Sequence, residues 1–246
     1  YTAMILRVFV FGVVTILAIA HHSAGQVRAI KSASATKSFE VGRGGSSGST
    51  SGFLAEFFLQ LMFGEVVYQQ QRKLEQRHEI PSLVSVELLL QGAGQPSSYY
   101  ILNPRLRANW GLFSTDFRFN YILEEDIDGI QYLRTNDWQI VQLNLVTTGD
   151  VTFRVGGGFL QEAFAERKSY PEWTGGVHIR PFSSKLGGVI EYRGSEARNE
   201  VNGHVRYTFF EKKRLYGYLT AGVVFQRHYR EVNVWGFQSG FTFSIF

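Results

Sequence analysis

The chain has 246 residues and a net charge of +4, from 25 basic and 21 acidic side chains. A hydrophobic content of 44% excludes an intrinsically disordered protein, and the small positive excess lacks the clustered basic face of a nucleic-acid-binding protein. Cysteine is absent, which excludes disulfides and thiolate-based metal or catalytic sites. The 21 phenylalanines, 12 tyrosines and 26 glycines suit strands and tight turns better than helices.

Residues 1–25 are typical of a secretory signal peptide with a few upstream residues. Met4 starts the signal, Arg7 supplies its positive charge, and an apolar run covers residues 8–20. This run is shorter than the ~20 residues that a membrane-spanning helix needs. We therefore expect an exported chain whose mature form begins at Gln26.

Two segments separate the signal from the rest of the chain. Residues 26–52 are rich in Ser, Gly, Ala and Thr without a sustained period, which predicts a disordered linker. In residues 53–80 apolar side chains near helical spacing precede a polar tail, and Pro81 follows. This predicts an amphipathic helix that plugs the following domain, lies at a membrane interface or docks a partner, or else a poorly ordered tether.

From residue 83 to the C-terminus the apolar period is two. In residues 105–113, for example, Leu106 and Trp110 share one face while Arg105 and Arg107 share the other. In a soluble sandwich the apolar face would be the inner one, whereas in a membrane barrel it meets lipid and the polar face fills the lumen. The alternation indicates an all-β domain over residues 81–246 but does not choose between these two architectures.

Three further patterns favour the barrel. The predicted connections alternate between short ones, such as 147–150 and 211–214, and longer polar ones, such as 124–137 and 161–172. Many predicted strands approach the ~9 to 11 residues that cross a bilayer at a tilt. Trp and Tyr recur near strand ends, where they would form interfacial girdles. We predict a single antiparallel transmembrane β-barrel of about ten strands, with eight or twelve as alternatives, and a short N-terminal helix.

The C-terminal segment resembles the assembly signal of bacterial outer-membrane β-barrel proteins, whose last strand alternates aromatic residues and ends on Phe. The matching residues are Trp235, Phe237, Phe241, Phe243 and Phe246. The pattern from about residue 83 onward is also similar to uncharacterised small barrels of Bacteroidota-like, Gram-negative bacteria. The resemblance implies export, recognition by the outer-membrane insertion machinery, and a place among outer-membrane lipids and lipopolysaccharide, but no particular activity.

We further expect a monomer whose last strand closes the barrel against residues 85–91. Twelve polar residues on the predicted inner face would line the lumen. Because confined charges must be paired or hydrated, we expect a salt-bridge network that mostly fills a narrow barrel. The predicted lumen residues are Arg105, Arg107, Asp116, Arg118, Glu124, Arg154, His178, Arg180, Glu191, Arg193, His204 and Arg206, and Glu87 is a further candidate.

The expected function is structural, or an interaction through external loops near residues 126–136 and 164–170. The excess of arginine in the lumen leaves a narrow anion-leaning, porin-like pore or small-ligand channel as an alternative. A second alternative is an outer-membrane lipid-modifying enzyme, although no local signature joins the available histidines and serines. No catalytic residue, metal site or cofactor is predicted. The acidic run 124–129 lacks calcium-loop spacing, so we expect a solvated loop or one that bridges cations to lipopolysaccharide phosphates.

Overall fold

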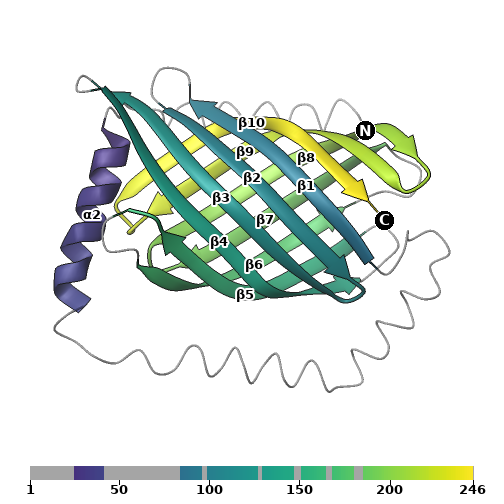
Figure 1. The fold of residues 1–246 in the computed structure, drawn as a ribbon, viewed down its shortest axis with the longest axis horizontal. Coiled ribbons are helices and arrows are strands. Elements are labelled where there is room, and N and C mark those ends of the chain that lie inside the picture. Colours follow the sequence, from purple (N-terminus) through teal and green to yellow (C-terminus); the bar gives the residue numbers. More distant parts are fainter. Residues whose placement is uncertain are drawn as a thin grey trace, which may run out of the picture.

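Ten strands form one closed antiparallel sheet in the computed structural model, which describes residues 25–41, 84–95, 99–126, 129–146, 151–164, 168–179 and 185–245. Each strand pairs with its neighbours in the chain, and the first strand pairs with the last (Figure 1). The strands are β1 (Val84–Gln95), β2 (Tyr99–Trp110), β3 (Phe113–Asp126), β4 (Gly129–Val146), β5 (Val151–Glu162), β6 (Ser169–Ile179), β7 (Leu186–Ser195), β8 (Arg198–Lys212), β9 (Leu215–His228) and β10 (Val232–Ile245).

The seam between β1 and β10 closes the barrel. Leu88 lies opposite Phe243, and Leu90 lies opposite Phe241. This register confirms the predicted closure of the last strand against residues 85–91. Since the sheet has no free edge, its ladder satisfies the backbone hydrogen-bonding groups of every strand from within.

The two faces of the sheet differ in chemistry. Apolar side chains point outward all around the barrel, and Leu106 and Phe241 are 49% and 48% exposed. The intervening polar side chains, such as those of Arg105 and Arg107, point inward and are buried. A soluble sandwich would bury the apolar set instead. The arrangement confirms the predicted barrel and gives it the polarity of a protein that is surrounded by lipid.

Four of the five aromatic residues of the predicted assembly signal are described by the structure, and all four share the outward face of β10. Phe241 and Phe243 are exposed, whereas Trp235 and Phe237 are half-buried. The ring of Phe237 contacts that of Trp235 edge to face, with 5.7 Å between the centroids. Phe246 lies outside the described residues.

The predicted alternation of short and long connections is wrong. The predicted loop 124–137 is mostly strand, because β3 continues to Asp126 and β4 begins at Gly129. Another connection on this side, between β7 and β8, which was also predicted to be long (residues 194–200), consists of only the two residues between Ser195 and Arg198. Strand pairing uses backbone groups alone, so a strand can continue through a polar stretch of sequence that is otherwise typical of a loop.

The N-terminal part also differs from its prediction. Residues Gln26–Val41, predicted as part of a disordered linker, form the helix α2. Its sequence has a weak apolar period, and the helix is stabilised by docking of Val27, Ile30 and Ala33, which lie about one turn apart and are buried. The signal up to residue 24, the rest of the linker and the predicted helix at 53–80 lie outside the described residues.

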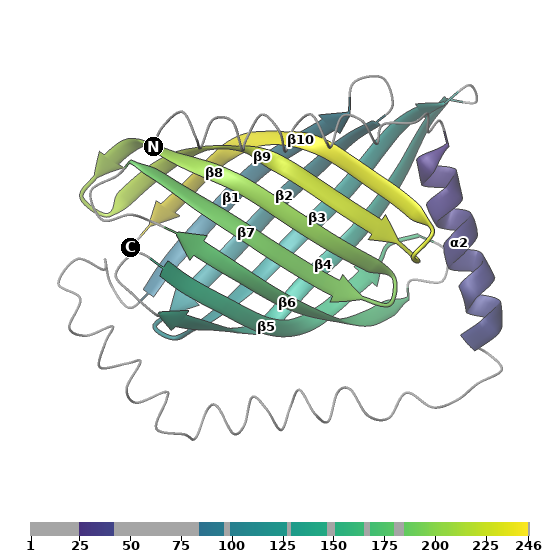
Figure 2. The same cartoon turned by 180° about the vertical axis from the view of Figure 1, so that it is seen from behind.

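Helix α2 lies across one end of the barrel, and the C-terminus lies at the other end (Figures 1 and 2). The helix packs on β3, β4 and β10, near the connections that follow β3 and β9. Within the described residues, no helix has the length and apolar character needed to cross a membrane.

Candidate functional site: the barrel interior

The middle of the barrel holds a cluster of buried charges, called the charge network below. It contains five arginines and six carboxylates that are joined by ion pairs. Its members are Arg105, Arg107, Arg118, Arg193 and Arg198 with Glu87, Asp116, Asp137, Glu172, Glu191 and Glu200.

Asp116 on β3 is one centre of the network. Its carboxylate accepts hydrogen bonds from Arg105, from Arg107 Nη2 at 3.0 Å and from Arg193 Nη2 at 3.0 Å. Arg105 and Arg107 belong to the adjacent strand β2, whereas Arg193 belongs to β7. Strands β3 and β7 are not neighbours in the sheet. These contacts therefore bridge the lumen from one wall to another.

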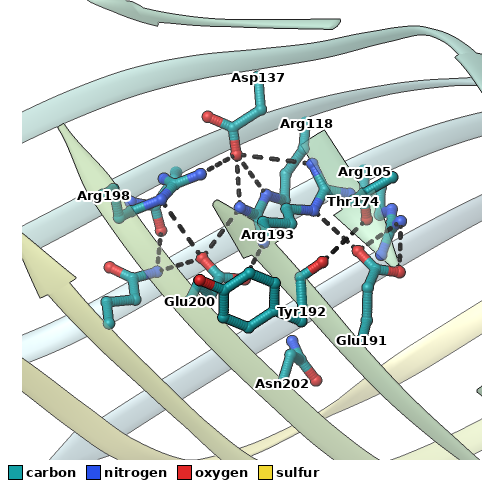
Figure 3. A network of polar contacts seen from close by, with 12 residues as sticks. Arg105, Arg118, Asp137, Thr174, Glu191, Tyr192, Arg193, Arg198, Glu200 and Asn202 are labelled. Carbon is teal, nitrogen blue, oxygen red and sulfur yellow. Dashed lines mark hydrogen bonds and ion pairs between the residues drawn. The ribbon is translucent and has the colours of Figure 1, made fainter. Parts of the chain in front are cut away.

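Asp137 on β4 is the second centre. It accepts from Arg118 Nη2 at 2.5 Å and from Arg198 Nη2 at 2.6 Å. Arg118 also donates to Glu200 Oε1 at 2.5 Å, across the lumen from β3 to β8. Arg193 Nη1 lies 3.7 Å from Asp137 Oδ2 and so links the two centres, as Figure 3 shows.

The network is close to electroneutral, because five arginines face six carboxylates. Ten of the eleven side chains are at most 6% exposed, and Glu87 is 13% exposed. An isolated buried charge costs several kcal/mol, and this penalty is offset only where each charge meets well-placed partners. The arrangement thus fills the middle of the lumen without leaving a cationic path through it.

Four members of the network were missed by the sequence reasoning. Asp137, Glu172, Arg198 and Glu200 fall within or at the ends of stretches predicted as loops. The sequence did contain a signal for them. Each of these residues is two positions away from another inward side chain of its strand, as Asp137 is from the buried Gln139. Leaving out three carboxylates produced the apparent arginine excess that had suggested an anion-leaning lumen.

The structure puts most of the predicted lumen residues inside the barrel. His178 and Arg206 are half-buried, and Arg180 lies outside the described residues. Fully buried are Arg105, Arg107, Asp116, Arg118, Glu124, Arg154, Glu191, Arg193 and His204. Six of these nine belong to the charge network, whereas Arg154 and His204 lie toward the end with the C-terminus.

The end of the interior under α2 is apolar, which the sequence reasoning did not predict. Inward side chains of seven strands form one buried cluster with Val27, Ile30 and Ala33 of the helix. The strand residues of this cluster include Ala93, Tyr99, Ile101, Ile122, Leu133, Leu160, Val224 and Val234. The helix therefore seals this mouth by burying apolar surface against the wall of the lumen.

Glu124 fixes the start of α2. One carboxylate oxygen accepts from the backbone N–H groups of Gly25 and Gln26 at 2.8 and 2.9 Å, and the other accepts from that of Val27 at 2.8 Å. The first turn of a helix has unpaired N–H groups and a partial positive charge, so a carboxylate here is stabilising. Glu124 is thus part of β3 and a helix cap, which corrects its prediction as part of a solvated acidic loop.

Glu162 holds the same helix from β5. It accepts a hydrogen bond from Ser34 Oγ at 3.1 Å and another from the hydroxyl of Tyr229 in the β9–β10 connection. Burial, with the adjacent Glu162 carboxylate, raises the pKa of Tyr229 above its ordinary value. The phenol therefore stays protonated as a donor across the pH range in which proteins are handled.

No catalytic arrangement is present among the described histidines. His178 contacts Arg154, His204 contacts Asn202 and Arg206, and His228 contacts Gln226. None of these contacts is made to a serine hydroxyl or a carboxylate within the described part of the chain. Nor does that part contain a group of three or more side chains that could hold a metal ion.

Comparison with known proteins assigns this chain to no family. No protein-family model matches the chain, and no curated protein matches it. Among solved structures, the N-terminal β-barrel domain of Pseudomonas aeruginosa OprF shares 12% identity at a TM-score of 0.31. The match covers 65% of this chain and 97% of that one. The fold assignment rests on the strand pairing described above.

Replacing Asp116 by Asn should destabilise the barrel by about 3 to 5 kcal/mol, because three buried arginines would lose a shared counter-charge. The measurement is the free energy of unfolding in urea of the refolded barrel in neutral detergent micelles. Glu211→Gln, on the exposed end of β8, is the control and should change this free energy by less than about 0.5 kcal/mol. Equal effects of the two substitutions would contradict the assigned role of Asp116.

Glu124→Gln should loosen α2, since an amide has one acceptor oxygen and would turn its NH₂ toward a backbone donor. Hydrogen exchange of the first-turn amides should become about five- to thirtyfold faster, a loss of about 1 to 2 kcal/mol. Glu125→Gln is a close control, because Glu125 is the next residue of β3 and is exposed. Unchanged exchange in the Glu124 variant would show that the cap does not hold the helix.

Proposed function

We propose that this protein is an integral outer-membrane β-barrel with a closed lumen and a structural role in the membrane. The observation that carries the proposal is the combination of an exposed apolar outer face with an interior filled by paired charges. An apolar outer face of this extent would be a liability in water and is stabilising in lipid.

Two independent barriers support the closed lumen. The charge network bridges opposite walls in the middle of the barrel, from β3 to β7 and from β3 to β8. Helix α2 then seals one mouth with its apolar face. A conducting pore needs a continuous hydrated path, so either barrier alone would suffice to prevent steady ion flow.

The proposed partners follow from the outer face of the barrel. Outer-membrane lipids and lipopolysaccharide would surround the apolar belt, and the alternating aromatics of β10 would be read by the insertion machinery of a Gram-negative bacterium. The seam residues of β1 and β10 are already paired with each other, which favours a monomer.

A structural role is favoured over one mediated by loops. The connections at the mouth covered by α2 are short, and the longest lies between Glu162 and Ser169. Such connections offer a partner little surface compared with the outer wall of the barrel. The interaction surface of this mouth would then be α2 together with the rims of the strands.

The test is electrical recording from the purified, refolded full chain in planar lipid bilayers. We expect no steady conductance, either from the wild type or from a variant that lacks residues 26–41, because the charge network still blocks the lumen. Each sample is first checked for folding by its changed mobility on a gel after boiling. Stable single-channel currents from the folded wild type would overturn the closed lumen and favour the narrow pore.

A further inference from the structure

Four inward side chains lie between the charge network and the barrel end that is opposite α2. They are Arg154 on β5, His178 on β6, and His204 and Arg206 on β8, here called the Arg–His group. Arg154 Nη1 lies 3.3 Å from His178 Nε2, and Arg206 Nε donates to His204 Nε2 at 3.2 Å. The group therefore consists of two arginines, each held by a histidine.

The two arginines of this group lack a direct ion-pair partner among the described residues. Among the residues that the structure describes, no carboxylate lies within the 4.0 Å ion-pair distance of Arg154 or Arg206. Every arginine of the charge network, in contrast, has at least two carboxylate partners. Arg154 is nevertheless buried, with only 7% of its surface exposed. A buried guanidinium without a counter-ion is costly.

The neighbours of these arginines orient them without neutralising them. Arg154 Nε donates to Asn144 Oδ1 at 2.7 Å, and His204 Nδ1 lies 3.1 Å from Asn202 Oδ1. An imidazole nitrogen that accepts from a guanidinium carries no proton, so His204 is neutral while it holds Arg206. Both arginines are therefore fixed in position. Glu87 attracts both of them electrostatically, but its own ion pair is with Arg107, at 3.6 Å.

The two halves of the group face the same part of the interior. His178 and His204 lie at the same level on either side of Val189 of β7, and Arg206 lies opposite Gly187 of that strand. His178 interacts electrostatically with both arginines. An anion near His178 would consequently be attracted by both guanidinium groups at once.

We propose that the Arg–His group is a binding site for a small phosphate-bearing anion inside the barrel. Guanidinium groups offer several N–H donors in a fixed fork that matches phosphate oxygens, and the second ring nitrogen of His178 can supply an additional donor. Together the charge network and the Arg–His group hold seven arginines and six carboxylates, so one positive charge is left for a ligand to neutralise. The site lies toward the barrel end where β5 begins and β6 and β8 end, which is opposite the end that α2 covers (Figure 1).

The test is isothermal titration of the refolded full chain with inorganic phosphate, in an uncharged maltoside detergent without lipid. We expect a saturable isotherm with a stoichiometry near one. Arg154→Gln and Arg206→Gln should each weaken binding about tenfold or more, which corresponds to about 1.4 kcal/mol. Arg214→Gln, an exposed cation in the β8–β9 turn at the same end, is the matched control and should bind like the wild type.

Folding of each variant is checked by its mobility on a gel before and after boiling, and an unfolded variant is replaced by Arg154→Lys or Arg206→Lys. No saturable binding by the folded wild type, or binding that both arginine variants retain, would overturn the site. If binding appeared only after an anionic phospholipid was added to the micelles, the bound phosphate group would lie on the outer surface of the barrel. This result would also overturn the interior site. Because the test uses a folded barrel in detergent, its failure leaves the proposed membrane function intact.

Discussion

Complete backbone hydrogen bonding within a closed sheet is the constraint on which the rest of this structure depends. In a lipid environment no water is available to an unpaired N–H or C=O group, so a sheet can cross it only if its first and last strands pair. The seam between β1 and β10 meets this requirement over nine residue pairs, from Val86 with Ile245 to Gly94 with Phe237. Closure then fixes which side chains face outward and which are confined.

Confinement explains the chemistry of the interior. Inward positions of a narrow barrel are cut off from bulk water, so charges there are stable only in matched sets. Asp116 and Asp137 each gather arginines from different strands, and this ties opposite walls together. The apolar layer under α2 meets the same constraint differently, because Ile101 and Val234 need no partners and are covered by the helix.

The interior is thus divided into three layers along the barrel. An apolar layer lies under α2, a nearly neutral charge network fills the middle, and the Arg–His group lies toward the C-terminal end. The arginines of the middle layer are paired with carboxylates, whereas those of the third layer have no carboxylate within ion-pair distance among the described residues. This asymmetry gives the two ends of the barrel different chemistry.

Much of the fold could be predicted from the sequence, because a period of two is a local property that survives in each strand. The alternation of Leu106 and Trp110 with Arg105 and Arg107 predicts which side chains lie on the outer and inner faces of the sheet. The aromatic spacing of β10 predicts the last strand. Loop lengths could not be predicted, since polar side chains such as Asp137 read alike in a loop and on the inner face of a strand. The order of α2 depends on Glu124, about a hundred residues away, which no local pattern reveals.

The most direct measurement uses the absence of cysteine from the chain. Leu88, Leu89, Leu90 and Gln91 are replaced by Cys one at a time, and each folded barrel in lipid vesicles is treated with a lipid-soluble or a charged, water-soluble maleimide. Leu88 and Leu90 point outward, whereas Leu89 and Gln91 are buried inside. Positions 88 and 90 should react only with the lipid-soluble reagent, and positions 89 and 91 with neither until the barrel unfolds. Rapid reaction of 88 and 90 with the charged reagent would contradict the lipid-facing wall, and reaction of 89 and 91 would contradict the closed lumen.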